Sequence, residues 1–321
     1  MKDERKPILV YIVGKGHSGS TMLELLLNRS ANIAAMGEID MLALQVYRDE
    51  ETRWVGRCSC GERPQDCSYW GTVIREINSQ YGVDFVRKPF KWPISDVGIE
   101  EEYGVRRPLA WSWYRFHRLV RTVAYRGSGQ VVGPFGRQYR QWIANRDYVA
   151  TQYAKVRGVE AVVDASKDPL QMRDIVAYSQ LPVRILFLTR DVRGLAWSAV
   201  RRRRNTAVRE ARRWTKLNAH ILSLLAGIDP NIWLHIPYES VCADSEVALN
   251  RIHRFIGVER RALSPLEERS RRHTVAGNRT RLRDLTDIRE DQSWRENLSK
   301  ADIDAIRAVA GDLAARLGYE I

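Results

Sequence analysis

Four short runs of apolar, mostly β-branched residues recur along the chain, and amphipathic stretches lie between them. Short apolar runs of this kind are typical of strands that are buried on both faces of a sheet. The runs cover 8–13, 161–164, 184–189 and 231–236, and helical patterns follow the first three at 21–28, 170–178 and 192–225. This alternation predicts an α/β fold with a central parallel sheet and flanking helices.

The middle of the chain, from about 54 to 145, breaks this alternation. It is rich in Trp, Tyr, Arg and Pro, and no internal repeat or low-complexity linker sets it apart. We therefore expect a single domain over 1–321 that carries a largely helical insertion at about 54–145. At 44% hydrophobic residues, the 321-residue chain has ample material for a core.

The chain is basic, with 52 Lys and Arg against 39 Asp and Glu and a net charge of +13. Such an excess concentrates anionic ligands near the protein. Nucleic acid, an anionic membrane surface and a phosphorylated small molecule are all compatible with it, but we find no nucleic-acid recognition motif. The run Arg201–Arg204 is interpreted as a solvated helix face, with steering of an anion as the alternative.

We expect no membrane span and no secretory signal. No segment reaches the roughly 18 apolar residues that cross a bilayer, and the apolar run at 7–13 is too short for the core of a signal peptide. A cytoplasmic location is therefore the expectation.

A glycine-rich segment, Gly-Lys-Gly-His-Ser-Gly-Ser-Thr at 14–21, joins the first predicted strand to the first helix. Glycines let backbone N–H groups point inward, and a helix N-terminus adds unpaired donors and the positive end of its dipole. The segment predicts a phosphate cradle. Gly14, Gly19 and Thr21 match the spacing of an ATP-binding loop, but Ser20 stands where that loop has its lysine, which disfavours ATP or GTP hydrolysis.

A second candidate anion ligand follows the strand predicted at 184–189. Arg190 comes at the carboxyl end of that strand, and Ser198 lies eight residues later in the following helix. Ligands of open α/β sheets bind at the carboxyl ends of the strands. Arginine offers a charge-assisted fork and serine a hydroxyl donor, so the pair is a candidate site for another phosphate.

Together, GxxHSGST and RDxRxxxxS resemble the two nucleotide motifs of the sulfotransferase family, in particular its bacterial and tyrosylprotein branches. Further elements of that family occur in the same order along the chain. They are Gly37-Glu38, Lys167-Asp168-Pro169, Trp214 with Asn218, Tyr238-Glu239, and Gly277-Asn278 with Arg281. The resemblance covers about 8–40 and 160–300.

The resemblance implies a sheet like that of the nucleotide kinases and transfer of a sulfuryl group from 3′-phosphoadenosine 5′-phosphosulfate (PAPS). The product is adenosine 3′,5′-bisphosphate (PAP), and no metal is required. The acceptor would be a hydroxyl or amine of a small molecule, carbohydrate, lipid or peptide. The nucleotide ligands would be Lys15, Gly16, His17, Ser18, Gly19, Ser20, Thr21, Arg190, Ser198, Asn278, Arg279 and Arg281.

The resemblance also implies catalytic roles for three side chains. Glu38 is the candidate general base, and Lys167 the cation that neutralises the bridging oxygen of the donor. His17 departs from the family, which has Arg or Lys there. It is either a donor ligand or a rival for the base.

Other interpretations remain open. A nucleotide or small-molecule kinase would use the same fold, and a non-enzymatic binder of an anionic polymer or membrane would use the same charge. Aromatic and basic residues at 111–118 either contact the acceptor or belong to an amphipathic helix that packs on the sheet.

Three cysteines cluster at Cys58, Cys60 and Cys67, and Cys242 stands apart. A zinc site is the alternative to a packed group of reduced thiols. No fourth ligand is obvious nearby, and the C-x-C spacing differs from the usual C-x₂-C. We therefore expect reduced thiols and no metal.

Overall fold

The computed structural model describes residues 6–47, 56–96, 107–126, 129–203, 205–282 and 288–321. Five parallel strands form one sheet in the order β2-β3-β1-β4-β5. The strands are β1 (Ile8–Gly14), β2 (Ile33–Gly37), β3 (Ala161–Lys167), β4 (Val183–Thr189) and β5 (Trp233–Pro237). The predicted α/β fold with a central parallel sheet is confirmed.

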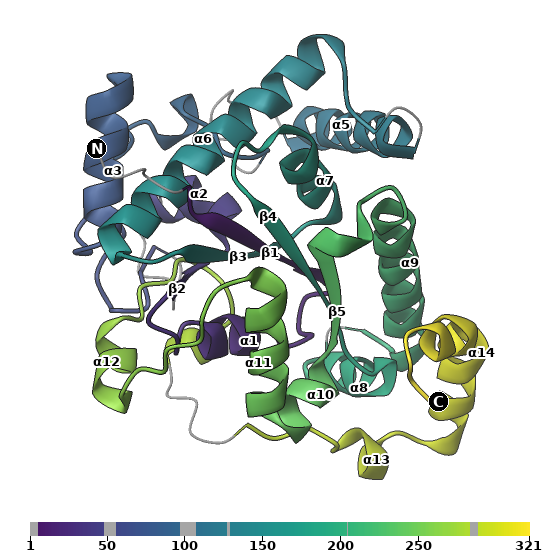
Figure 1. The fold of residues 1–321 in the computed structure, drawn as a ribbon. Coiled ribbons are helices and arrows are strands. Elements are labelled where there is room, and N and C mark those ends of the chain that lie inside the picture. Colours follow the sequence, from purple (N-terminus) through teal and green to yellow (C-terminus); the bar gives the residue numbers. More distant parts are fainter. Residues whose placement is uncertain (1–5, 48–55, 97–106, 127–128, 204, 283–287) are drawn as a thin grey trace.

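Helices cover both faces of this sheet (Figure 1). The helices are α1 (Ser20–Leu27), α2 (Leu42–Tyr47), α3 (Trp70–Tyr81), α5 (Arg107–Arg126), α6 (Gly133–Arg157), α7 (Pro169–Tyr178), α8 (Val192–Arg201), α9 (Ala207–Leu225), α10 (Tyr238–Ala243), α11 (Ser245–Ile256), α12 (Pro265–Ser270), α13 (Trp294–Asn297) and α14 (Lys300–Arg316). Short 3₁₀ turns are η1 (Ile39–Met41), η2 (Pro89–Lys91), η3 (Pro230–Ile232) and η4 (Arg279–Leu282).

Alternation along β1 divides the core into two layers. Leu9, Tyr11 and Val13 pack with α3, α6, α7 and α9 on one face. Val10 and Ile12 pack with α1, α10 and α11 on the other. Because successive strand residues point to opposite faces, an unbroken apolar strand must be covered on both sides, as the sequence pattern predicted.

Two elements differ from the predictions. The strand β2 was missed, because two of its five residues are alanine and it is held by pairing with β3 and by Val275, whose N–H donates to the carbonyl of Met36 at 2.9 Å. The helix expected over 192–225 is two helices. The helix α8 ends at Arg201, the first residue of the arginine run, and Thr206 caps α9 by accepting from the Arg209 N–H at 3.3 Å.

The described part of the predicted insertion contains α3, η2, α5 and the beginning of α6. Tyr125 on α5 and Arg121 beside it bond to Asp174 on α7, so this part of the chain rests on the helices that cover the sheet. None of the described helices is long and apolar enough to cross a membrane.

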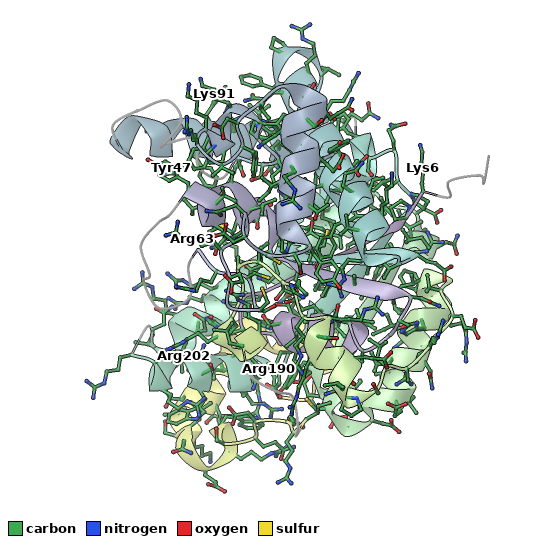
Figure 2. All side chains as sticks on the ribbon, turned by 90° about the vertical axis from the view of Figure 1, so that its left-hand side faces the viewer. Lys6, Tyr47, Arg63, Lys91, Arg190 and Arg202 are labelled. Carbon is green, nitrogen blue, oxygen red and sulfur yellow. The ribbon has the colours of Figure 1, made fainter. Side chains whose placement is uncertain are left out.

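Parallel strands bring their carboxyl ends to one edge of the sheet, and the loops that leave this edge build the site. Figure 2 shows Lys6, just before β1, on the opposite side of the molecule from Arg202, just after α8. At this edge β1 and β4 lie so close that only glycine fits at position 14. A Cβ added to Gly14 would lie 2.3 Å from the Leu188 carbonyl oxygen.

Candidate functional site

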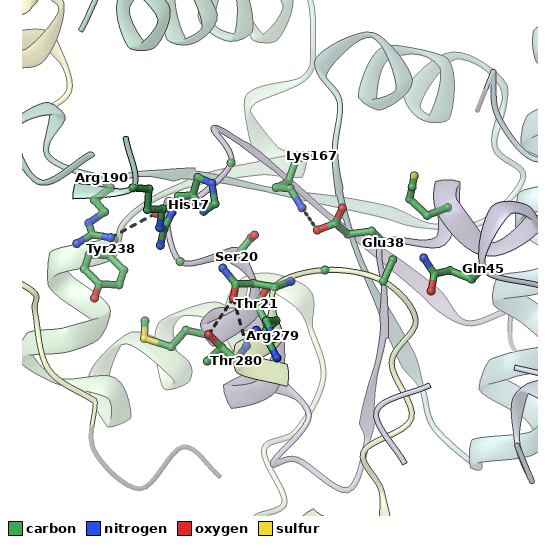
Figure 3. Close-up of a pocket in the computed structure, with 18 residues that line it drawn as sticks. His17, Ser20, Thr21, Glu38, Gln45, Lys167, Arg190, Tyr238, Arg279 and Thr280 are labelled. Carbon is green, nitrogen blue, oxygen red and sulfur yellow. Dashed lines mark hydrogen bonds and ion pairs between the residues drawn. The ribbon is translucent and has the colours of Figure 1, made fainter. Parts of the chain in front are cut away.

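A cavity of about 810 Å³ opens at the carboxyl edge, and residues that follow all five strands line it. Its size is within the range of small-molecule sites. The lining includes most of the predicted site residues, namely Gly16, His17, Gly19, Ser20, Thr21, Glu38, Lys167, Arg190, Asn278 and Arg279. Figure 3 shows Arg190 and Tyr238 on one side of the cavity, Glu38 and Gln45 on the other, and Ser20 and Lys167 between them.

The glycine-rich loop turns sharply before α1. His17 and Gly19 have left-handed backbones, with φ of 73° and 95°. Gly19 is the N-cap of α1 and, having no side chain, caps none of the N–H groups of the first turn. The first turn of α1 also contains no acidic residue, so its N–H groups and positive dipole end face the cavity without a side-chain anion.

Arg190 is held in place from several sides. Its guanidinium lies over the Tyr238 ring, 4.5 Å from the centroid, and Nη1 donates to the His17 carbonyl at 3.3 Å. Trp214 donates to the Arg190 carbonyl at 3.0 Å. The buried Nη2 has no hydrogen-bond partner among the described residues. A buried donor that lacks a partner costs free energy, and an anion in the cavity would supply the acceptor.

Glu38 and Lys167 form an ion pair inside the cavity (Figure 3). The Lys167 ammonium also donates to the Ala165 carbonyl at 2.9 Å, and its backbone is left-handed, with φ of 72°. Glu38 follows β2, and its N–H donates to the Val275 carbonyl at 3.0 Å. Each partner therefore stands on backbone that is fixed at the end of a strand.

Two acids near this pair were not found from the sequence. Glu24 on α1 is buried, and neither carboxyl oxygen has a hydrogen-bond partner among the described residues. Burial raises the pKa of Glu24 to about 8, against the opposing charge of Lys167. Burial likewise raises the pKa of Asp40 to about 7. A signal for Glu24 existed, since it is the one charged residue in the apolar run Met22–Leu27.

The segment that contains Gly277 and Asn278 closes another wall of the cavity. The Asn278 N–H donates to Thr21 Oγ1 at 3.4 Å. Gly277 has φ of 91°, and a Cβ added there would lie 3.6 Å from both Thr21 Oγ1 and Glu38 Oε1. This segment thus lies against both the glycine-rich loop and Glu38.

Four residues predicted to bind the nucleotide do not line the cavity. Lys15 pairs with Glu210 at 2.5 Å. Ser18 and Ser198 are buried. Arg281 is buried as well, and its guanidinium donates to the carbonyls of Thr274 and Arg57 at 3.0 and 2.9 Å.

Asp164 in β3 does not line the cavity, and its carboxylate binds the buried Arg146 and accepts from Ser166 Oγ at 2.6 Å. The cavity gains lining residues that the sequence did not single out as ligands, namely Met22, Met41, Gln45, Arg202, Ala276 and Thr280.

The helix α5 reaches the same edge of the sheet. Arg118 pairs with Asp168 at 2.5 Å, next to Lys167 in the chain. Tyr114 and Phe116 are exposed on α5. The side chains of Trp111 and Trp113, also in the aromatic stretch 111–118, lie outside the described residues.

No protein-family model matches the chain, and no curated protein matches it in sequence. Solved structures do match. The sulfotransferase domain of the Synechococcus PCC 7002 olefin synthase is 16% identical, with 99% of this chain and 98% of that chain covered and a TM-score of 0.47. The sulfotransferase domain from the curacin biosynthetic pathway is 15% identical, with coverages of 99% and 100% and a TM-score of 0.48.

A sulfotransferase from Alicyclobacillus acidocaldarius is 14% identical, with coverages of 97% and 96% and a TM-score of 0.41. At these identities and TM-scores the likeness assigns no function, which is therefore argued from the site.

Proposed function

We propose that the protein is a sulfotransferase that uses PAPS and transfers its sulfuryl group to a hydroxyl or amine. One observation carries the proposal. The bare N-terminus of α1, the unsatisfied Nη2 of Arg190 and the Glu38–Lys167 pair all belong to one cavity. PAPS has two separate anionic ends and a group to transfer, and these features offer a complement to each.

The donor would bind with its 5′-phosphosulfate at the loop of Gly16, Gly19, Ser20 and Thr21. Its 3′-phosphate would then meet Arg190, and Asn278 and Arg279 would lie beside the nucleotide. The N–H groups of the loop and the guanidinium are anion ligands that need no metal. His17 lines the cavity beside Arg190 and is proposed as a further donor to the phosphosulfate.

In the reaction, a new bond forms between the acceptor oxygen or nitrogen and sulfur, while the bond from sulfur to the bridging phosphate oxygen breaks. Glu38 would accept the proton that the acceptor loses. The Lys167 ammonium would neutralise the charge that develops on the bridging oxygen. Their ion pair aims both groups into the cavity before substrates arrive.

A kinase is disfavoured because the glycine-rich loop has no lysine at the position that binds the β- and γ-phosphates. A kinase on this fold holds the β- and γ-phosphates with a loop lysine. Here Ser20 occupies that position, and the nearby Lys15 is paired with Glu210 at 2.5 Å.

The experiment is a turnover assay with PAPS and a panel of acceptors, namely a phenol, a sugar, a primary alcohol and a tyrosine peptide. PAP release is measured by chromatography. We expect release that requires one acceptor class and no divalent metal. Absence of release with every acceptor, together with no binding of PAP, contradicts the proposal.

A further inference from the structure

Three cysteines and a histidine converge outside the cavity. Their ligand atoms, Sγ of Cys58, Cys60 and Cys67 and a ring nitrogen of His273, all lie within 4.8 Å of one another. Cys58, Cys67 and His273 are buried, and Cys60 is exposed. His273 lies 206 residues beyond Cys67, so the fold supplies the fourth ligand that the cysteine segment lacks in sequence.

The histidine is oriented as a ligand. Its Nε2 lies 3.0 Å from the Ser270 carbonyl, which can only accept, so Nε2 carries the proton. The other ring nitrogen, Nδ1, faces the thiols, 3.2 Å from Cys67 Sγ and 3.9 Å from Cys58 Sγ, and is the nitrogen available to bind a metal. A bond from the distal ring nitrogen to a carbonyl is the usual second contact of a metal-bound histidine.

The surroundings fix the backbone of His273 as well. Trp70 and Tyr153 both donate to its carbonyl at 2.7 Å, and the Tyr69 ring packs edge-on against the imidazole with centroids 4.4 Å apart. The two carbonyl bonds fix the backbone, and the ring cannot rotate away from the sulfurs without losing its packing on Tyr69 and the bond of Nε2 to Ser270.

We propose that Cys58, Cys60, Cys67 and His273 bind a structural Zn²⁺. Three thiolates and one imidazole are a known donor set for closed, four-coordinate zinc sites. Bond lengths of about 2.3 Å to sulfur and 2.0 Å to nitrogen place tetrahedral ligand atoms roughly 3.5–3.8 Å apart. The group is thus already close to the size that one ion requires, and it is too small to enclose an iron–sulfur cluster.

The metal would clamp a loop of the cysteine segment to a wall of the cavity. Ser59 N–H donates to the Thr274 carbonyl at 3.0 Å, and Thr274 N–H donates to Ser59 Oγ at 2.8 Å. Arg281 adds its bonds to Arg57 and Thr274 from the other side. In the segment that follows, Val275 pairs with β2, and Ala276 to Thr280 line the cavity.

Zinc is measured directly, by mass spectrometry of the purified parent protein and of three variants. We expect one zinc per chain in the parent and loss of the bound zinc in Cys60→Ser and His273→Ala, because each variant lacks one of the four ligands. Cys242→Ser, at a thiol remote from the group, keeps its zinc. Cys60 is exposed, so its substitution leaves the core packed, and circular dichroism checks that the variant folds.

Cobalt provides a second measurement. After removal of zinc by a chelator, Co²⁺ added to the parent gives the visible absorption of tetrahedral thiolate coordination, and Cys60→Ser loses it. A parent without metal, whose cysteines all react with a thiol reagent or are joined by a disulfide, overturns the inference. So does zinc retained by both ligand variants. Neither readout depends on PAPS, so failure here leaves the proposed function standing, and the reverse also holds.

Discussion

Arg190, the proposed ligand of the 3′-phosphate, is held by contacts from several elements. The Tyr238 ring lies under the guanidinium of Arg190, and the His17 carbonyl accepts from Nη1. The indole N–H of Trp214 donates to the backbone carbonyl of Arg190. These contacts come from the ends of β1 and β5 and from α9, and they leave Nη2 without a partner among the described residues. A guanidinium held in this way loses little side-chain entropy when it binds an anion.

Replacing Arg190 tests its assigned phosphate. We expect Arg190→Ala to weaken PAP binding about 10- to 100-fold, because a hydrogen bond to a charged group contributes roughly 1.5–3 kcal/mol. Adenosine 5′-monophosphate, which lacks the 3′-phosphate, serves as the comparison in isothermal titration and is expected to bind both proteins alike. Arg201→Ala, at an exposed arginine that pairs with Asp291, is the matched control. Equal losses for both nucleotides would refute the assignment of Arg190 to the 3′-phosphate.

The proposed role of Glu38 as general base is tested by the kinetics of a variant. We expect Glu38→Gln to lower kcat by at least about 100-fold, because general-base catalysis contributes roughly 10²–10⁴. PAP affinity is expected to persist, since the amide still fits the position of the carboxylate. Steady-state rates and PAP titration on the same variant provide the measurement. An unchanged kcat would transfer the role of base to another group, with His17 the next candidate.

Glu24 makes stability depend on pH. Its pKa is about 8 in the folded protein, against 4.5 as the ordinary value. Between these values the folded protein keeps a proton that the unfolded chain releases, so the free energy of unfolding falls as pH rises. The contribution is complete below pH 4.5 and lost above about pH 8, at up to about 1.4 kcal/mol per pH unit.

The Glu24→Gln substitution removes this titration while keeping the shape of the side chain. Chemical denaturation at several values from pH 5 to 8 is expected to give a shallower fall in unfolding free energy for the variant than for the parent. The slopes are compared, so any constant cost of the buried amide cancels. Parallel curves would mean that Glu24 is ionised in the folded protein throughout this range.

At the scale of elements, the beginning of α1 depends on one glycine. Gly19 has φ of 95°, and a Cβ added there would lie 2.5 Å from the Tyr238 ring. We expect Gly19→Ala to lower the free energy of unfolding by at least about 1–2 kcal/mol, the cost of a left-handed backbone alone. At Gly16 an added Cβ meets no atom within 4 Å, so Gly16→Ala is the control. Denaturant titration distinguishes them, and equal stabilities would contradict the strained turn.

The strands that were predicted carry a local apolar pattern, whereas the strand that was missed depends on pairing with distant residues. β1, β3, β4 and β5 were predicted, because each has an apolar, β-branched run that any buried parallel strand requires. β2 contains Ala34 and Ala35 instead, and its backbone is held by β3 and by Val275, some 240 residues away. Pairing over that separation leaves no local pattern to find.

At the scale of the whole molecule, parallel strands assemble the site. Most of the predicted ligands line one cavity, because the loops that carry them leave the same edge of a sheet whose five strands all point the same way. Motif spacing and the family resemblance predicted Ser20, Lys167 and Arg190, and all three line the cavity. It could not show that Arg281 is tied to backbone carbonyls, nor that His273 completes the group of three cysteines, since only the fold brings those partners together.

We propose that this cavity binds a nucleotide with phosphates at both its 3′ and 5′ positions, without a metal. Isothermal titration of the parent protein with PAP in the presence of a chelator tests it most directly, with ATP and Mg²⁺ as the comparison. We expect saturable binding of PAP at one site per chain, and weaker or no binding of ATP. Tight binding of ATP–Mg²⁺ with no detectable binding of PAP would contradict it.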